Sequence, residues 1–124
     1  MSVTGIGAKE FVLVEALDDF IDLRLLAQHV GDLLRTSDVK TVRNRTLAVI
    51  RELLDEELIV VGTLGVMSGE IEPWTCLAEA ATERIAREWE SLGRAPSLYE
   101  IACFQDTPAG QVIGQDLKDR LGLK

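Results

Sequence analysis

The chain has 124 residues, of which 47% are hydrophobic and only 5% aromatic, so Leu, Ile, Val and Ala must supply most of the core. This composition excludes a disordered chain, and no apolar run approaches the roughly 18 to 20 residues that span a bilayer. A formal net charge of −8 disfavours nucleic acid and anionic membranes as partners of the whole surface and favours a basic protein.

The N-terminal part of the sequence predicts two short helices. Residues 8–18 are expected to form the first, although the apolar run FVLV within them also suits a buried strand. A second helix is predicted over residues 21–30, because Leu, Ala and Val recur there at helical spacing. Gly31 is a natural left-handed stop for this helix, and RTSDVK (35–40) then predicts a loop.

The stretch VRNRTLAVIRELLDEELIVVG (42–62) predicts a third helix over residues 40–57 that runs into a strand, LIVVG. One half of this helix is apolar and suits a core. The other half is polar and consists of Asn44, Arg45, Ala48, Arg51, Glu52, Asp55 and Glu56. Three glycines in GTLGVMSGE (62–70) then predict a loop or hairpin tip.

A longer fourth helix is predicted to have Pro73 in its first turn and to end at Leu92, just before Gly93. Its core face is expected to hold Trp74, Leu77, Ala78, Ala81, Ile85, Trp89 and Leu92. Its opposite face carries Glu79, Glu83, Arg87 and Glu90, and Glu83 and Arg87 have the spacing of a helical ion pair. This acidic face is either a solvated surface or a ridge that meets lysines and arginines of another protein.

The C-terminal part predicts one further helix, which follows a segment whose conformation the sequence leaves undecided. Ser97 and Glu100 form a capping-box pair, but the segment that they open, residues 97–106, fits either a helix or a strand. Thr107, followed by a proline, is expected to cap a last helix that ends at Gly122. The apolar stripe expected on that helix consists of Ile113, Leu117 and Leu121.

The order helix, helix, helix and then LLDEELIVVG resembles the winged-helix family over residues 8–70. In that family the third helix lies in the major groove of DNA and the following strand leads into a wing. Glu57 stands where the family has a glycine before the strand, which puts the expected left-handed turn in doubt. The resemblance assigns DNA contacts to the basic and amide side chains Lys40, Arg43, Asn44, Arg45 and Arg51.

Local charge argues both for and against this DNA-binding interpretation. Residues 35–51 carry five bases and one acid, a local charge of +4 within an acidic chain. The outward face of the third helix, however, has three acids against two arginines, a net charge of −1. Asp55 lies one helical turn beyond Arg51 and offers it a partner. We therefore treat a winged-helix DNA-binding regulator as the alternative function.

The pieces EPW, ERIAREWESLGRAPSLYEIACF and DTPAG resemble small bacterial proteins, some of which are similar to immunity proteins encoded beside secreted toxins. That resemblance implies a non-enzymatic immunity protein or antitoxin that blocks a basic toxin. The carboxylates expected to contact such a basic partner are Glu52, Asp55, Glu56, Glu79, Glu83 and Glu90. A monomer and a homodimer are both compatible with the sequence.

Residues that carry catalytic or metal chemistry are sparse in this sequence. His29 is the only histidine, and it lies on a leucine-rich helix where a structural role is expected. Cys76 and Cys103 lack the spacing of a zinc site, and two buried thiols in a reducing cytoplasm are expected in preference to a disulfide. The sequence therefore predicts a cytoplasmic protein that is not an enzyme and uses no cofactor or metal, and its N-terminus lacks the pattern of a signal peptide.

The elements together predict a single domain over residues 1–124 of mainly α, α+β class with a small β element. A winged-helix-like helical core (8–70) is expected to be followed by the long amphipathic helix and a C-terminal helix (71–124).

Overall fold

The computed structural model describes residues 6–17 and 19–122, and these residues form five helices and one four-stranded antiparallel sheet. The predicted α+β class is therefore confirmed. In chain order the elements are α1 (Ala8–Glu15), β1 (Ile21–Asp22), α2 (Leu23–Leu34), α3 (Val39–Asp55), β2 (Ile59–Leu64), β3 (Ile71–Pro73), α4 (Ala78–Leu92), β4 (Cys103–Asp106) and α5 (Pro108–Leu121).

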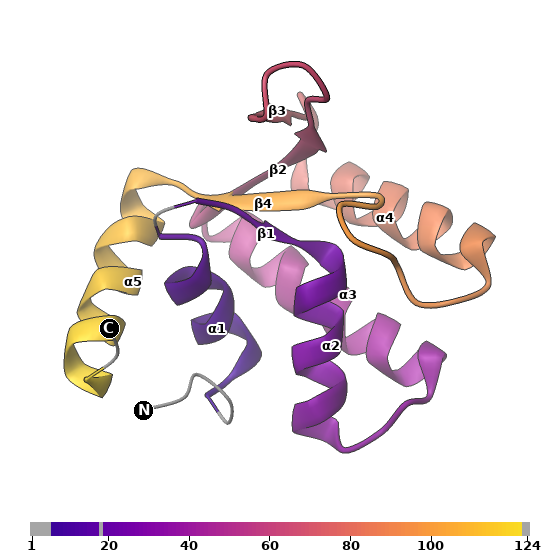
Figure 1. The fold of residues 1–124 in the computed structure, drawn as a ribbon, viewed down its shortest axis with the longest axis horizontal. Helices are drawn as coiled ribbons and strands as arrows, with labels where there is room; N and C mark the ends of the chain where they lie inside the picture. Colours follow the sequence, from indigo (N-terminus) through magenta and orange to yellow (C-terminus); the bar gives the residue numbers. More distant parts are fainter. Residues whose placement is uncertain (1–5, 18, 123–124) are drawn as a thin grey trace.

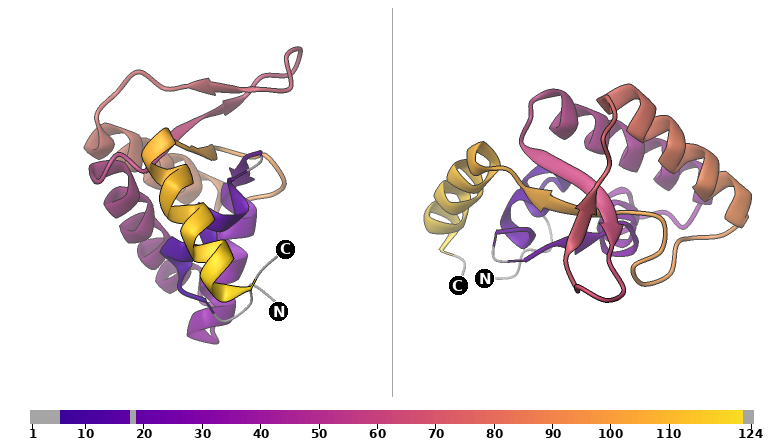
Figure 2. Two further views of the ribbon diagram at one scale, coloured as in Figure 1. Left: turned by 90° about the vertical axis from the view of Figure 1, so that its left-hand side faces the viewer. Right: turned by 90° about the horizontal axis from the view of Figure 1, so that it is seen from above.

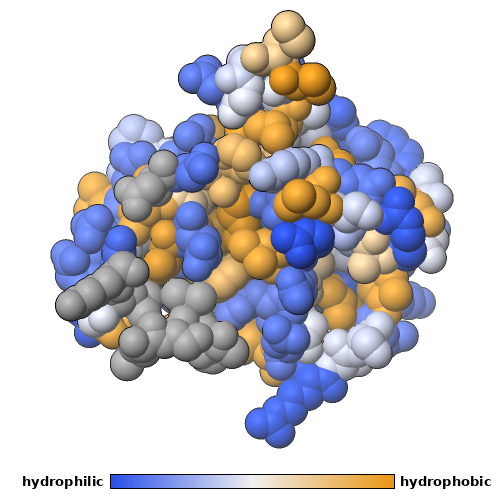
Figure 3. Space-filling view, in the orientation of Figure 1, coloured by the Kyte–Doolittle hydropathy of each residue, from blue (hydrophilic) through white to orange (hydrophobic). Residues whose placement is uncertain are grey.

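The sheet has the strand order β1-β4-β2-β3, with α1, α2, α3 and α5 below it in Figure 1. Strand β4 lies between β1 and β2, so the sheet joins the N-terminal and C-terminal parts of the chain. The β2–β3 hairpin projects from the other side, and its apolar tip includes Val66 and Met67, each 97% exposed (Figure 3). Among the described residues, the helices are too short or too polar to cross a membrane.

The first helix begins at Ala8 as predicted but ends at Glu15, before the predicted end at residue 18, which lies outside the described residues. The second helix begins and ends later than predicted. Residues Ala8, Phe11 and Val12 of α1 are buried at helical spacing, so this segment is a helix and not a strand. Helix α2 begins only after Asp22, whose side chain accepts a hydrogen bond from the Leu25 N–H. It continues past Gly31, so the predicted stop there was wrong. The Gly31 carbonyl instead accepts the closing hydrogen bond from Thr36 N–H, and Arg35 (φ 53°) is the left-handed residue.

Helix α3 has well-defined caps at both ends. The Asp38 side chain accepts a hydrogen bond from Thr41 N–H at its start. At its end, Leu58 N–H donates to Leu53 C=O and Glu57 N–H donates to Leu54 C=O, which is the pattern of a Schellman cap. Glu57 has φ 58°, so the left-handed turn forms here despite the missing glycine. The turn leads directly into β2, and the predicted helix–strand order is confirmed.

Pro73 does not open a helix, contrary to the prediction. It is the last residue of β3 and pairs with Gly62. Trp74 then stays on the sheet, because its backbone N–H donates to Val61 C=O and its indole N–H donates to Thr63 Oγ1 at 2.9 Å. The chain is therefore free to turn into a helix only at Ala78, the first residue of α4.

The core face of α4 is narrower than predicted. Ala81, Ile85 and Trp89 are buried as expected, and Gly93 ends the helix with φ 66°. Leu77 was wrongly placed in the core, since it is 81% exposed. The expected ion pair between Glu83 and Arg87 is replaced by one between Arg84 and Glu88, with Nε and Oε2 2.8 Å apart. The Arg84 guanidinium also lies 3.8 Å from the centre of the Trp74 ring.

Residues 97–106 form a turn followed by a central strand. Ser97 N–H donates to Glu100 Oε1 at 2.7 Å, as a capping box requires, but the chain does not continue as a helix. Tyr99 (φ 60°) and Ile101 (φ 71°) take left-handed conformations that redirect it into β4. Arg94 donates to both carboxylate oxygens of Glu100, and these hydrogen bonds are the main reason that the pKa of Glu100 falls to about 2.

Helix α5 is capped as predicted and packs closely on α1. The Thr107 hydroxyl accepts a hydrogen bond from Gly110 N–H at 3.1 Å, and Gly122 (φ 69°) ends the helix. Gly114 allows close approach to α1, because a Cβ there would collide with Leu13 C=O. Of the predicted apolar stripe, Leu117 packs against the core while Ile113 is 40% exposed.

The core contains Trp89, Phe104 and many aliphatic side chains. His29 is part of it: the imidazole stacks on Phe11 with ring centres 3.9 Å apart, and its Nε2 lies 2.9 Å from the Ile6 carbonyl oxygen. Cys103 is buried, but Cys76 is exposed, so the expectation of two buried thiols was wrong. Burial raises the pKa of the Cys103 thiol to about 11, and the charge of Asp22 adds to this shift.

Candidate functional site

A groove runs between the last turns of α3 and the first turns of α4. Its larger hollow, about 580 Å³, is floored by β2 and bounded by the β3–α4 connection. A shallower hollow of about 370 Å³ continues between the two helices, and both hollows share Arg51. Figure 2 shows α3 and α4 running side by side along this line. We call this feature the α3–α4 groove.

Acidic side chains line the α3–α4 groove. The larger hollow holds Asp55, Glu57 and Glu79, and the shallower one holds Glu83. Four carboxylates against the single guanidinium of Arg51 give the groove a net charge of −3. Arg51 Nε donates to both oxygens of Asp55, each at 3.0 Å, so this arginine is already matched within its own helix.

The other three carboxylates of the groove have no such partner. Among the described residues, no ion pair is formed by Glu57, Glu79 or Glu83, and all three are exposed. Their charges are spread along the groove and not focused on one point. This arrangement suits several cationic side chains of a partner better than a single ion.

Apolar surface accompanies these charges. Leu77 precedes α4, is 81% exposed, and provides no side-chain cap for the first N–H groups of the helix. Leu54 and Trp74 are half-buried beside it, and Trp74 is fixed in place by its bond to Thr63. The groove therefore offers an apolar anchor point with carboxylates around it, a combination typical of protein-binding surfaces.

The six carboxylates predicted to contact a basic partner do not form one surface. Asp55, Glu79 and Glu83 lie together in the α3–α4 groove. Glu52 and Glu56 are on the side of α3 that faces α1, where both form ion pairs with Lys9 Nζ. The hydrogen bond that Lys9 donates to Glu56 is the largest cause of the raised pKa of Lys9. Glu90 is exposed near the far end of α4.

The residues assigned to DNA are also divided between two places. Asn44, which is exposed, and Arg51 line the α3–α4 groove beside α4. Lys40, Arg43 and Arg45 lie on the first turns of α3 and form no ion pair within the described part of the chain. The partner that the sequence predicted for Arg51, namely Asp55, is confirmed.

Sequence reasoning missed three members of the groove: Glu57, Cys76 and Leu77. The signal for Glu57 was its position at the end of a helix, where a left-handed residue is common. In that conformation its side chain does not follow the direction that the helical spacing predicts. Leu77 and Cys76 were misplaced because the helix was predicted to start too early. No side chain before Ala78 caps the helix, so the sequence carries only a weak signal of where the helix starts.

Comparisons with known proteins add no relative. No protein-family model matches the sequence, and no curated protein or solved structure is significantly similar to it.

Proposed function

We propose that this protein is a non-enzymatic cytoplasmic protein that binds a basic segment of another protein in the α3–α4 groove. The observation that carries the proposal is a set of carboxylates that form no ion pair with any described residue, Glu57, Glu79 and Glu83, beside the exposed Leu77. The class of protein that fits is an immunity protein or antitoxin, whose partner is a basic toxin.

The mechanism is occlusion of a cationic surface. Carboxylates along the groove attract a partner rich in lysine and arginine and speed its capture, while the opposite sign repels acidic competitors. Leu77 inserts into an apolar depression of that partner and supplies affinity that charge alone does not give. A partner whose cationic site normally holds nucleic acid loses access to it once the site is covered.

Cys76 allows a direct search for the partner, because it lies in the groove and is exposed while Cys103 is buried and has a high pKa. A photoactivatable crosslinker on Cys76 should capture a basic protein from an extract of the native cells. The matched control moves the thiol to the other end of α4 (Cys76→Ser with Ser91→Cys), about 20 Å away along the helix. Capture of no basic protein, or equal capture by the control, contradicts the proposal.

The second candidate is a DNA-binding regulator, favoured by Lys40, Arg43 and Arg45, which form no ion pair within the described residues, and by the left-handed turn at Glu57. It predicts binding to the DNA upstream of its own gene that weakens steeply as salt rises. Neutralising these three cations with glutamine should then abolish a low-salt gel shift. Asn44 and Arg51 lie apart from these three cations, in the α3–α4 groove. Mass measurement in solution distinguishes monomer from homodimer in either case.

A further inference from the structure

Strand β2 is only half covered on its outer side. It has six residues, and β3 pairs only with its second half, from Gly62 to Leu64 (Figure 1). The pairing ends with one hydrogen bond from Trp74 N–H to Val61 C=O, and the chain then leaves the sheet toward α4. The start of β2, at Ile59, therefore has β4 on one side and no strand of the described chain on the other. Unpaired strand edges are places where another chain can pair.

Hydrogen bonds on the two sides of β2 fix the direction of the Ile59 main chain. On the β4 side, Leu58 C=O accepts from Thr107 N–H. On the β3 side, Val61 C=O accepts from Trp74 N–H. Main-chain groups of successive strand residues point to opposite edges, so those of Ile59 point to the β3 side, as those of Val61 do. The N–H and C=O of Ile59 form no hydrogen bond with any described residue, so this edge presents one donor and one acceptor.

This edge faces the larger hollow of the α3–α4 groove. Ile59, Val60 and Val61 all line that hollow. Side chains of successive strand residues point to opposite faces of a sheet, so three residues in a row line one hollow where it lies against the edge of the strand. Ile59 is buried at the floor, where an extended chain laid beside β2 reaches it. A helix offers it no partner, because the main-chain groups of a helix are bonded to one another.

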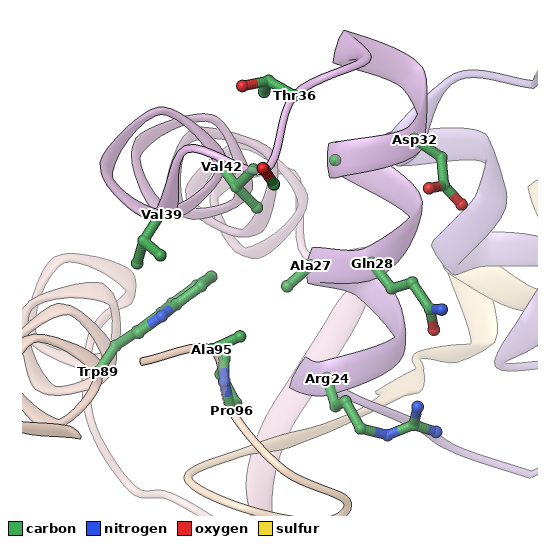
Figure 4. A pocket seen from close by; sticks show the side chains of 12 residues that line it. Arg24, Ala27, Gln28, Asp32, Thr36, Val39, Val42, Trp89, Ala95 and Pro96 are labelled. Atoms are coloured by element: carbon green, nitrogen blue, oxygen red, sulfur yellow. The ribbon is translucent and has the colours of Figure 1, made fainter. Parts of the chain in front are cut away.

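A second hollow, of about 380 Å³, offers no strand edge. Figure 4 shows its walls, which come from α2, the first turns of α3 and the region around Trp89 at the end of α4. None of the residues that line it belongs to a strand. An extended segment therefore has no main chain to pair with there, and the indole N–H of Trp89 serves as an internal control for binding in the groove.

We propose that the partner enters the α3–α4 groove as an extended segment that pairs with Ile59 and continues the sheet where β3 leaves it. The pairing rests on the proposed function and adds to it the form in which the basic segment binds. Main-chain hydrogen bonds hold the segment in register, and its lysine or arginine side chains reach the carboxylates of Asp55, Glu57 and Glu79. A second copy of this chain does not suit the site, because it would bring further carboxylates to a groove with four of them and one guanidinium.

Amide exchange of the free protein tests the open edge without a ligand. The Ile59 amide should exchange with deuterated solvent at least tenfold faster than the Val60 amide, which faces β4. Equal protection of the two amides would overturn the proposal, because the edge would then be closed.

A hexapeptide of alternating lysine and valine is the probe for pairing, together with two isomers that are N-methylated on the lysines or on the valines. The isomers have equal charge and composition, but only one carries its methyl groups on the edge that pairs with β2. That isomer should bind roughly tenfold more weakly than the other, because it has lost main-chain donors. The unmethylated peptide should shift and protect the Ile59 amide of the ¹⁵N-labelled protein and leave the Trp89 indole signal in place.

Replacing Glu57, Glu79 and Glu83 with glutamine separates pairing from charge. If this variant binds the peptide more weakly but the two isomers bind equally, the pairing is overturned and the proposed function stands. If the isomers differ but the variant binds as wild type, the pairing stands and the role of charge in the proposed function is overturned. An absence of saturable binding, or an unmoved Ile59 amide, overturns the pairing, and capture through Cys76 then tests the proposed function separately.

Discussion

Helix α3 has carboxylates on two sides whose surroundings differ. On the side toward α1, Glu52 and Glu56 share Lys9, so two charges are partly neutralised within the fold. On the side toward α4, only Asp55 has a cationic partner, while Glu79 and Glu83 across the groove have none in the described residues. The comparison teaches that tertiary neighbours as well as helical spacing decide which charges remain available to a partner, because Lys9 comes from α1 whereas Arg51 lies one turn from Asp55 in the same helix.

Asp106 is the extreme case, because it is buried and forms no ion pair with the part of the chain that the structure describes. It is 6% exposed, and neither of its carboxylate oxygens accepts a hydrogen bond from a described residue. Burial raises its pKa to about 7 from the ordinary 3.8. The folded protein therefore keeps this proton where the unfolded chain loses it, so the contribution of Asp106 to stability falls as pH rises from about 4 to about 7.

The largest expected effect follows from this burial. Asp106→Asn should stabilise the protein by an amount that grows from near zero at pH 4 to at most about 4 kcal/mol above pH 7. Urea unfolding of both proteins at a series of pH values measures the difference. The exposed Asp19→Asn is the control and should give a small difference at every pH. A difference for Asp106→Asn that is flat with pH contradicts the burial argument.

Removing Lys9 sharpens the comparison between the two sides of α3. Lys9→Met should lower the free energy of unfolding by about 1 kcal/mol at neutral pH, since two partly exposed ion pairs are lost. The matched control, Lys40→Met, removes the same charge from a lysine without an ion pair in the described residues and should change stability by less than about 0.5 kcal/mol. Equal effects in denaturant titrations would mean that Lys9 does not neutralise its neighbours.

Glu57 is both a carboxylate of the α3–α4 groove and a residue with a strained, left-handed backbone. Glu57→Gly should raise the free energy of unfolding by about 1 kcal/mol, because glycine adopts φ 58° without the clash of a Cβ. Glu57→Ala removes the same charge but keeps the Cβ, so it should bring little gain. A gain of the same size in both variants would assign the effect to charge and not to backbone conformation.

Arg51 gives the smallest expected change in stability. Arg51→Gln removes one pair within α3 and should cost about 0.3–0.5 kcal/mol. It also frees Asp55, so the α3–α4 groove becomes more acidic and should bind its basic partner more tightly. Thermal unfolding and a binding titration check the two halves of this prediction, and weaker binding would show that Arg51 itself contacts the partner.

The parts of the fold that the sequence predicted are those fixed by local interactions. The Thr107 and Gly122 caps of α5 and the apolar half of α3 depend on residues close together in the chain. The missed parts depend on distant partners: β1 has only two residues and exists because it pairs with β4, and Pro73 belongs to a strand because β2 lies beside it.

The candidate site divides in the same way. Asp55, Glu79 and Glu83 were predicted as exposed acids, and the structure brings them into one groove. Glu52 and Glu56 pair with Lys9, which lies more than 40 residues earlier in the sequence. The periodicity of a single helix cannot predict such a contact. The exposure of Leu77 could not be predicted, because the hydrogen bonds of Trp74 to β2 keep the chain out of the helix until Ala78.

The most direct measurement is the affinity of the partner captured through Cys76 for two variants of equal charge. One replaces the groove carboxylates Glu57, Glu79 and Glu83 with glutamine, and the other replaces Glu15, Glu70 and Glu90, which are exposed outside the groove. We expect the groove variant to bind at least 30-fold more weakly at physiological salt and the other variant to bind nearly as wild type. Equal affinities would contradict the assignment of the α3–α4 groove as the binding site.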